Sequence, residues 1–275
     1  MTLCRLFVYF ILFSVMGWIY ESIFCTIKNH HWANRGFLFG PLCPIYGVGA
    51  VACVMVCDVW FGPLNNLQIF VICFIGSIVL EYSTHYVLEK LFHAVWWDYS
   101  KSFCNINGRV CLPASIGFGI AGILVLDFFY PFAQFLTSWM NPMVMELVAL
   151  LFMAVFGADL ALTVGALSSL MQNVQAIEKA VNEQMEEFYQ GLEDGYQDKK
   201  NDWAEKRAEI TAATTARFSG LLNLSQRHVV HSVKEFRYPE SLKTVGAQLM
   251  KLERGIKKGA QTVKEVATRE RKQPE

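Results

Sequence analysis

Charged residues are scarce in the first 170 residues of this 275-residue chain. That part holds six basic and eight acidic groups, while the rest holds 18 basic and 16 acidic ones, out of 24 of each sign. Where charge is missing, apolar residues form runs long enough to cross a hydrocarbon core of about 30 Å. Residues 1–170 are therefore predicted to be a transmembrane domain, and residues 171–275 a charged helical tail.

The chain also lacks the Gly-x-x-x-x-Gly-Lys-Ser/Thr phosphate loop. This excludes it from being the ATPase of a transporter. No nucleophile and base pair is recognisable either, because Ser100, Ser102 and Ser115 have no histidine within local reach. We expect no catalytic residues, although a membrane enzyme stays open as an alternative.

Cysteine is absent after residue 111, and no Cys-x-x-Cys pair or Cys/His array with zinc spacing occurs. Cys53, Cys57 and Cys73 fall inside predicted helices, where they are interpreted as small, polarizable packing residues. The sequence therefore predicts no metal and no cofactor.

The apolar runs predict an all-α bundle of about five transmembrane helices. A signal peptide is not favoured for the first run, because it is too long and no small-x-small cleavage site follows it before Trp18 and Glu21. The third run is the least regular, since acidic groups and a histidine occupy its second half. The five predicted segments are about 3–27, 41–61, 67–92, 112–136 and 143–170.

The basic groups of the membrane part are distributed unevenly. Apart from Arg5, they lie in or beside the loops at 28–40 and 90–111, and the loops near 62–66 and 137–142 have none. With five crossings, the positive-inside rule places the N-terminus outside the cell and the C-terminal tail in the cytoplasm. We thus expect a multi-pass protein of the cell membrane.

Three polar residues form a stripe on the third predicted helix. Glu81, His85 and Glu89 are spaced i, i+4, i+8, which places them on one face. Carboxylate and imidazole groups can ligate metals, but three on one helix cannot close a site alone. A buried hydrogen-bonded network that joins helices is the favoured interpretation.

The loop at 96–113 is unusually rich in aromatic and polar residues for a connection between membrane helices. Its tryptophans and tyrosine suit an interfacial aromatic belt, but the loop is equally suited to build part of a site. We expect Arg35 and Arg109 to reach Glu21, Glu81 or Asp98, because a carboxylate inside a bilayer normally faces a partner or water. The predicted polar cluster at the cytoplasmic face, drawn from residues 34–47, 81–89 and 96–111 together with the end of the first helix, contains Glu21, Asn34, Arg35, Tyr46, Glu81, Glu89, Trp97, Asp98, Tyr99, Asn105 and Arg109.

Three runs of the sequence match a family. They are GWIYES (17–22), NRGFLFGPLCPIYGVGA (34–50) and EYSTHYVLEKLFHAVWWDYSKSFCNINGRVCL (81–112). They resemble the bacterial putative ABC transporter permease family, type IV, over about residues 1–165. His85 stands where the family is expected to have a small hydroxyl residue, which disfavours a metal there.

The resemblance implies transport, as a permease subunit that works with a separate ATPase. The chain lacks the Glu-Ala-Ala and distant Gly pattern of a coupling helix, and five crossings imply a homodimer or another membrane subunit. The alternatives are a membrane-embedded enzyme acting on a lipid or phosphate-bearing substrate, in which arginine grips an anion, and a non-catalytic membrane scaffold. Expected partners are the lipid bilayer and other protein subunits, with no nucleic acid.

The tail divides by charge. Residues 174–209 show an apolar stripe that continues from the fifth predicted helix, and they carry ten acidic and five basic groups. Residues 210–275 carry 13 basic and six acidic groups, so this part either contacts the acidic part or lies on anionic lipid. A coiled-coil dimer is a further alternative, and the last residues are expected to be disordered.

Overall fold

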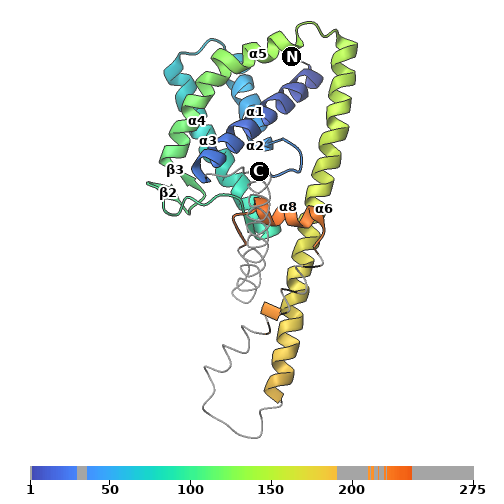
Figure 1. Cartoon of the computed structure of the whole chain (residues 1–275). Coiled ribbons are helices and arrows are strands. Elements are labelled where there is room, and N and C mark those ends of the chain that lie inside the picture. The colour runs from blue at the N-terminus through green and yellow to red at the C-terminus, as the bar shows by residue number, and fades with distance from the viewer. Residues whose placement is uncertain are drawn as a thin grey trace, which may run out of the picture. The chain divides into compact units, whose positions relative to one another are not determined.

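The computed structural model of the chain (Figure 1) describes residues 2–29, 36–190 and 222–236, and single residues at 210, 212, 213, 216 and 220. The residues that the structure describes are mostly helical, so the predicted all-α class is confirmed. It divides into two compact units, and each is described by itself. Unit 1 comprises residues 1–91 and 95–164, and unit 2 comprises residues 92–94 and 165–275.

The elements follow in chain order. The first part contains α1 (Leu3–Asn29), α2 (Pro44–Val54), the π-helix η1 (Met55–Trp60) and α3 (Asn66–Phe92), followed by the short strands β1 (Ala94–Val95), β2 (Asn105–Ile106) and β3 (Val110–Cys111). The second part contains α4 (Leu112–Leu124), the π-helix η2 (Val125–Phe129), α5 (Tyr130–Thr137), α6 (Pro142–Gln190), α8 (Leu224–Ser232) and β4 (Glu235–Phe236).

Local signals explain where several helices begin. Proline occupies the first turn of α2 and of α4, where its missing N–H has no partner to lose. At the start of α3, the Asn65 and Gln68 side chains each accept the backbone N–H of the other residue, at 2.9 and 3.0 Å, which forms a capping box. Asn141 caps α6 by accepting the Val144 N–H at 2.9 Å.

Two π-helical segments interrupt otherwise regular helices. The segment η1 continues α2 to Trp60, and η2 joins α4 to α5. Pro131 lies in the first turn of α5, directly after η2. Because proline lacks an N–H and its ring meets the carbonyl four residues earlier, regular α-helical bonding cannot continue through it. The wider π turn accommodates the break.

Within the described part of the chain, four helices are long and apolar enough to cross a membrane, namely 3–27, 66–92, 112–137 and 142–173. The segment predicted at 41–61 is instead a 17-residue helix, Pro44–Trp60. It is shorter because residues 36–43 form bends before Pro44. Seventeen residues rise about 26 Å, slightly less than the hydrocarbon core.

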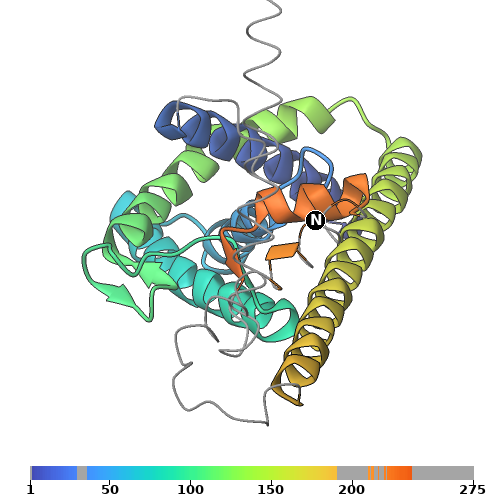
Figure 2. The same cartoon turned by 60° about the horizontal axis from the view of Figure 1, so that its bottom comes forward.

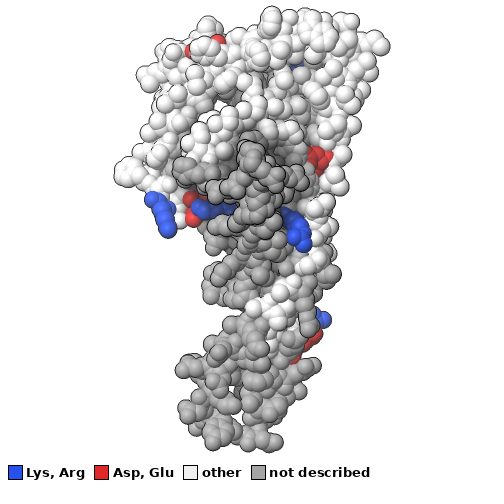
Figure 3. Space-filling view, in the orientation of Figure 1, with Lys and Arg blue, Asp and Glu red and all other residues white. Residues whose placement is uncertain are grey.

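Exposed apolar side chains cover the outer faces of these helices. Leu67, Ile75 and Val79 of α3, and Leu150 and Leu162 of α6, are all more than half exposed. In Figure 3 the surface over α5 and the first half of α6 is almost without charged groups. Such faces suit lipid contact, because lipid imposes no cost on exposed apolar side chains.

The helix α1 packs closely along α2 in the opposite direction (Figure 1). Near one end Tyr46 lies beside Gly17, and towards the other end Val54 shares an apolar cluster with Tyr9. A Cβ added at Gly17 would overlap the Tyr46 side chain, and one added at Gly47 would lie 2.6 Å from the Phe10 carbonyl oxygen. Glycine therefore sets the separation of the two helices.

Unit 2 contains the second part of α6 and the short helix α8. Asn223 caps α8, and Gln226 on α8 donates to the Ser169 hydroxyl of α6 at 3.0 Å. Val229, Val230 and Val233 are buried, with 2%, 0% and 1% of their surfaces exposed. Most of the tail predicted at 171–275 lies outside the described residues.

Candidate functional site

The loop between α3 and α4 folds as a hairpin rather than as a plain connection (Figure 2). Strands β2 and β3 pair antiparallel, and the Arg109 N–H donates to the Ile106 carbonyl at 3.0 Å. Between them Asn107 and Gly108 have φ angles of 53° and 68°. Asparagine and glycine are the residues that adopt this left-handed conformation most readily, as in type I′ turns. The hairpin thus presents Arg109 at a fixed place.

Two predicted site residues hold the rest of the loop in shape. Asp98 accepts the Ser100 N–H at 2.9 Å, which closes a local turn. The Asn105 amide donates to the carbonyls of Ser100 and Ser102 at 3.2 and 3.0 Å, and its oxygen accepts the Gly108 N–H at 3.1 Å. Asp98 and Asn105 therefore organise the loop backbone.

Trp97 and His85 fix this loop to α3. The Trp97 indole N–H donates to the Arg109 carbonyl at 2.9 Å, and His85 Nε2 lies 3.2 Å from the Trp97 carbonyl, to which it donates. The two rings meet edge to face with centroids 5.4 Å apart. His85 is only 2% exposed. These contacts join the polar stripe of α3 to the loop that follows it, whereas the predicted network was one that joins helices.

At the edge of this network lies the rim cluster, composed of Tyr82, Tyr86, Glu89 and Arg109. Arg109 donates from Nε and Nη2 to Glu89 Oε2 at 3.2 and 2.8 Å, and from Nη1 to the Tyr82 hydroxyl at 2.8 Å. Its guanidinium also lies over the rings of Tyr82 and Tyr86, 5.0 and 5.3 Å from their centroids. The hydrogen bonds that Arg109 donates to Glu89 raise the pKa of Arg109 above its ordinary value.

The expected partners of Arg109 were therefore wrong. We expected it to reach Glu21, Glu81 or Asp98, and it pairs with Glu89. The reason is the hairpin, because the turn at 107–108 directs Arg109 towards the last two turns of α3.

Deeper in unit 1 lies the inner acidic cluster, composed of Glu21, Tyr46, Glu81 and Tyr99. Tyr46 donates to Glu21 at 3.0 Å, and Tyr99 donates to Glu81 Oε1 at 3.3 Å. The two carboxylates are near enough for the charge of Glu21 to act on Glu81. Glu81 is 5% exposed, and its Oε2 atom has no hydrogen-bond partner among the residues that the structure describes. A buried acceptor of this kind is costly unless something else binds it.

Aromatic rings surround the inner acidic cluster. The Tyr46 ring lies 6.1 Å from that of Tyr20 and 5.9 Å from that of Phe118. Burial, and to a smaller extent the negative charge of Glu81, raises the pKa of the Tyr99 hydroxyl. The hydroxyl therefore stays protonated and donates a hydrogen bond to Glu81. The cluster thus combines two carboxylates with aromatic faces, and both attract cations.

The loop before α2 meets the loop after α3. The rings of Phe37 and Trp96 are 5.2 Å apart. Asp159 on α6 accepts the backbone N–H groups of Phe39 and Gly40 at 3.0 and 2.9 Å, which fixes the loop before α2 to α6. Both loops therefore lie at the same end of unit 1, as the charge pattern predicted. A glycine is needed at 40, because a Cβ there would lie 2.8 Å from Asp159.

The predicted polar cluster is thus two clusters and a scaffold. Asn34 and Arg35 lie outside the described residues, and the other nine predicted residues all belong to this end of unit 1. The prediction did not include Tyr82 or Asp159. Tyr82 could have been predicted, because it lies seven residues before Glu89 and therefore on the same helix face. The Asn-Gly pair was a similar signal for the hairpin.

A comparison with known families decides the relationship. Residues 8–164 match the family described as "Putative ABC-transporter type IV". The chain belongs to this family. The match covers more than half of the chain and includes every residue of both clusters, so the resemblance seen in the sequence is confirmed. This member of the ABC-transporter type IV family is a multi-pass membrane protein. The curated proteins gave no match, and the solved structures gave none.

Proposed function

We propose that this protein is the membrane permease subunit of a transporter, that it works with a separate ATPase, and that the inner acidic cluster binds a cationic solute. The family and the four apolar spans support the transporter role. The observation that supports the site is Glu81, a buried glutamate on a span-length helix with one oxygen that has no described partner. A carboxylate inside a bilayer costs about 2.5 kcal/mol or more, and such residues commonly mark solute or ion pathways.

The chemistry of the cluster favours an organic cation of the ammonium type. Glu21 and Glu81 supply negative charge, and the Tyr46 and Phe118 rings supply aromatic faces. Ammonium groups bind to such faces as well as to carboxylates. The arginine of this end of unit 1 that the structure describes, Arg109, already binds Glu89 and Tyr82.

The enzyme alternative has less support. An enzyme acting on phosphate would need Arg109 for the anion, but Arg109 is held by a carboxylate. Burial, followed by the charge of Glu21, raises the pKa of the Cys43 thiol to about 12, so this cysteine is a poor nucleophile at neutral pH. No described observation favours catalysis over transport.

Binding is tested on the purified full chain in lipid nanodiscs. The melting temperature is measured with choline, tetramethylammonium or putrescine, with sodium chloride as the ionic-strength control. We expect the organic cations to raise the melting temperature of the wild type in a saturable manner, and Glu81→Gln to abolish the rise. Glu146→Gln, at an exposed glutamate of α6, is the matched control and should behave as wild type.

Two further variants assign the charge. Arg35→Ala asks whether Arg35 supplies the cation for Glu81, since stronger cation binding in this variant would show competition for the same carboxylate. Stabilisation by inorganic phosphate that depends on Arg109, without any effect of the three cations, would overturn the proposed site and support the enzyme alternative. An ATPase gene beside the gene for this chain is the matching expectation for the partner.

For orientation, we propose that the helix Pro44–Trp60 is a fifth crossing beside the four longer helices. The chain then lies in the cell membrane with its N-terminus outside and its tail in the cytoplasm. The native Cys104 reports on this. Cys104 is exposed in the hairpin loop, and Cys4 lies near the start of α1, at the other end of unit 1. A membrane-impermeant maleimide added to intact cells should leave Cys104 unlabelled and should label it after lysis, as mapped by mass spectrometry. Labelling of Cys104 in intact cells would reverse the orientation.

A further inference from the structure

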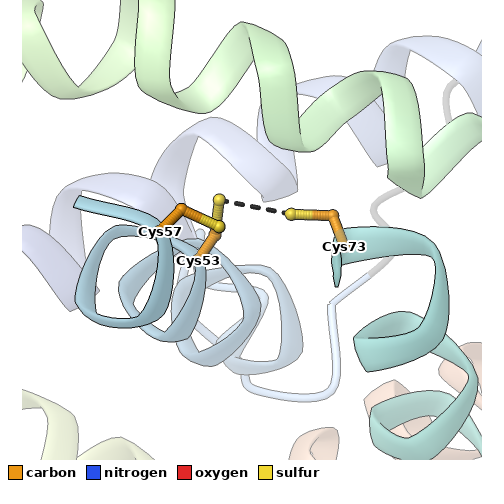
Figure 4. Close-up of side chains that lie close together, drawn as sticks. All are labelled: Cys53, Cys57 and Cys73. Atoms are coloured by element: carbon orange, nitrogen blue, oxygen red, sulfur yellow. Dashed lines mark hydrogen bonds between the residues drawn. The ribbon is translucent and has the colours of Figure 1, made fainter. Parts of the chain in front are cut away.

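Three cysteines gather inside unit 1, away from both clusters described above. Cys53 lies on α2, Cys57 on η1 and Cys73 on α3, and their Sγ atoms all lie within 4.8 Å of one another. The Sγ atoms of Cys53 and Cys73 are 3.4 Å apart, and all three cysteines are free thiols. Figure 4 shows Cys53 and Cys57 on one helix with their side chains directed towards Cys73.

The local structure explains why these thiols meet. Cys53 and Cys57 are four residues apart and share a helix face, and Cys57 belongs to the π-helical segment. π-Helical segments occur frequently at functional sites. On the other side, Gly122 of α4 leaves room for the sulfurs, because a Cβ there would overlap Cys73 and lie 3.8 Å from Cys53 Sγ.

The sequence predicts no metal here, because the spacing of these cysteines is not that of a zinc motif. The third thiol is contributed by a separate helix, 16 residues beyond Cys57 along the chain. Only the packing of α2 against α3 brings it within reach. The prediction from spacing therefore did not consider this arrangement.

The geometry suits one ion held by three sulfurs. An ion about 2.3 Å from each sulfur, the usual zinc–thiolate distance, needs sulfurs about 4.0 Å apart if the three ligands surround it evenly. The separation of one pair is 3.4 Å and that of the others is at most 4.8 Å, so each lies within about 1 Å of this value or below it.

The ligand set selects among ions. Thiolates are soft ligands that favour monovalent copper, zinc and iron–sulfur clusters. Zinc in structural sites takes four ligands, and the described residues offer a group of three. Monovalent copper is satisfied by two or three soft ligands, which is the number of thiols that this group offers.

We propose that Cys53, Cys57 and Cys73 form a binding site for a monovalent copper ion within the membrane domain. Each thiol that binds as a thiolate releases its proton, so binding strengthens as the pH rises. The site lies about 12 Å along α3 from Glu81, since Cys73 and Glu81 are eight residues apart. It is independent of the proposed cation site.

The experiment uses the reduced full chain in nanodiscs, under anaerobic conditions, with monovalent copper supplied as its bicinchoninate complex. We expect the wild type to take one equivalent of copper from the chelator. Each of Cys53→Ser, Cys57→Ser and Cys73→Ser should weaken retention by at least about tenfold, as expected for loss of one of three ligands. Cys4→Ser and Cys104→Ser are the matched controls and should retain copper as the wild type does.

Other results would overturn the proposal. Copper retention that is unchanged in Cys73→Ser would place the ion elsewhere, and zinc retained as tightly as copper would reject the choice of ion. A Cys53–Cys73 disulfide in protein purified without reductant would indicate a redox pair instead. Because a serine variant could fail to fold, the metal-free melting temperature of each variant is measured first, and protection of Cys57 and Cys73 from N-ethylmaleimide by copper is scored on the wild type.

Discussion

Two acidic residues on the same helix have opposite environments. Glu89, in the rim cluster, accepts two hydrogen bonds from Arg109 and lies 3.5 Å from His85 Nδ1. Glu81, in the inner acidic cluster, has one hydrogen bond from Tyr99 and an oxygen with no described partner. The two residues lie about 12 Å apart along α3. A satisfied carboxylate stabilises a fold, whereas an unsatisfied buried one costs stability and persists where function requires it.

Substitutions in the rim cluster should lower the free energy of unfolding more than substitutions in the inner acidic cluster. Arg109→Ala removes the partner of a carboxylate that is only 18% exposed, so we expect a loss of about 3 kcal/mol in the free energy of unfolding. Titration with denaturing detergent, followed by the labelling of buried cysteines, measures this. Lys101→Ala, at an exposed basic residue of the same loop, is the control and should change little. A similar loss in both variants would show that the bonds of Arg109 in the rim cluster do not stabilise the fold.

A second substitution disturbs the inner acidic cluster without changing its charge. A Cβ at Gly17 would overlap the Tyr46 side chain, so Gly17→Ala should move this tyrosine away from Glu21 and cost about 2 kcal/mol through overpacking. Gly76→Ala is the matched control, because Gly76 also lies in a membrane-spanning helix and nothing lies within 4 Å of the added methyl group. It should be neutral or slightly stabilising. Equal melting temperatures for the two variants would contradict the packing described here.

Much of this arrangement was predictable from local patterns. The apolar runs gave the helices, and the i, i+4, i+8 spacing placed Glu81, His85 and Glu89 on one face. The partner of Arg109 was not predictable in this way, because it depends on a hairpin whose turn directs the side chain along α3. The shortened second helix likewise reflects bends in 36–43 that are held by Asp159, which is more than 100 residues away. Long-range contacts of this kind leave no periodic signal in the sequence.

The hairpin turn offers a smaller and more local test. Asn107 has a φ of 53°, a conformation that costs most residues roughly 1 kcal/mol. Asn107→Ala should therefore destabilise the chain by about 1 kcal/mol more than Asn107→Gly does. Both variants lose the bond from the Asn107 amide to the Tyr82 hydroxyl, so their difference reports the backbone alone. The same detergent titration measures it, and a difference near zero would mean that the turn does not hold Arg109 in place.

The smallest change in stability is expected at the carboxylate proposed to bind solute. Glu81→Gln keeps the size of the side chain and the oxygen that accepts from Tyr99, and it removes a buried charge for which no full set of partners is described. The free energy of unfolding should therefore change by less than about 1 kcal/mol, whereas Glu89→Gln should lose about 2 kcal/mol with its charge-assisted bonds to Arg109. If Glu81→Gln destabilises the chain as much as Glu89→Gln does, both carboxylates are structural and the comparison fails. If Glu81→Gln leaves the stability nearly unchanged and abolishes stabilisation by organic cations, the buried carboxylate of Glu81 serves binding rather than folding.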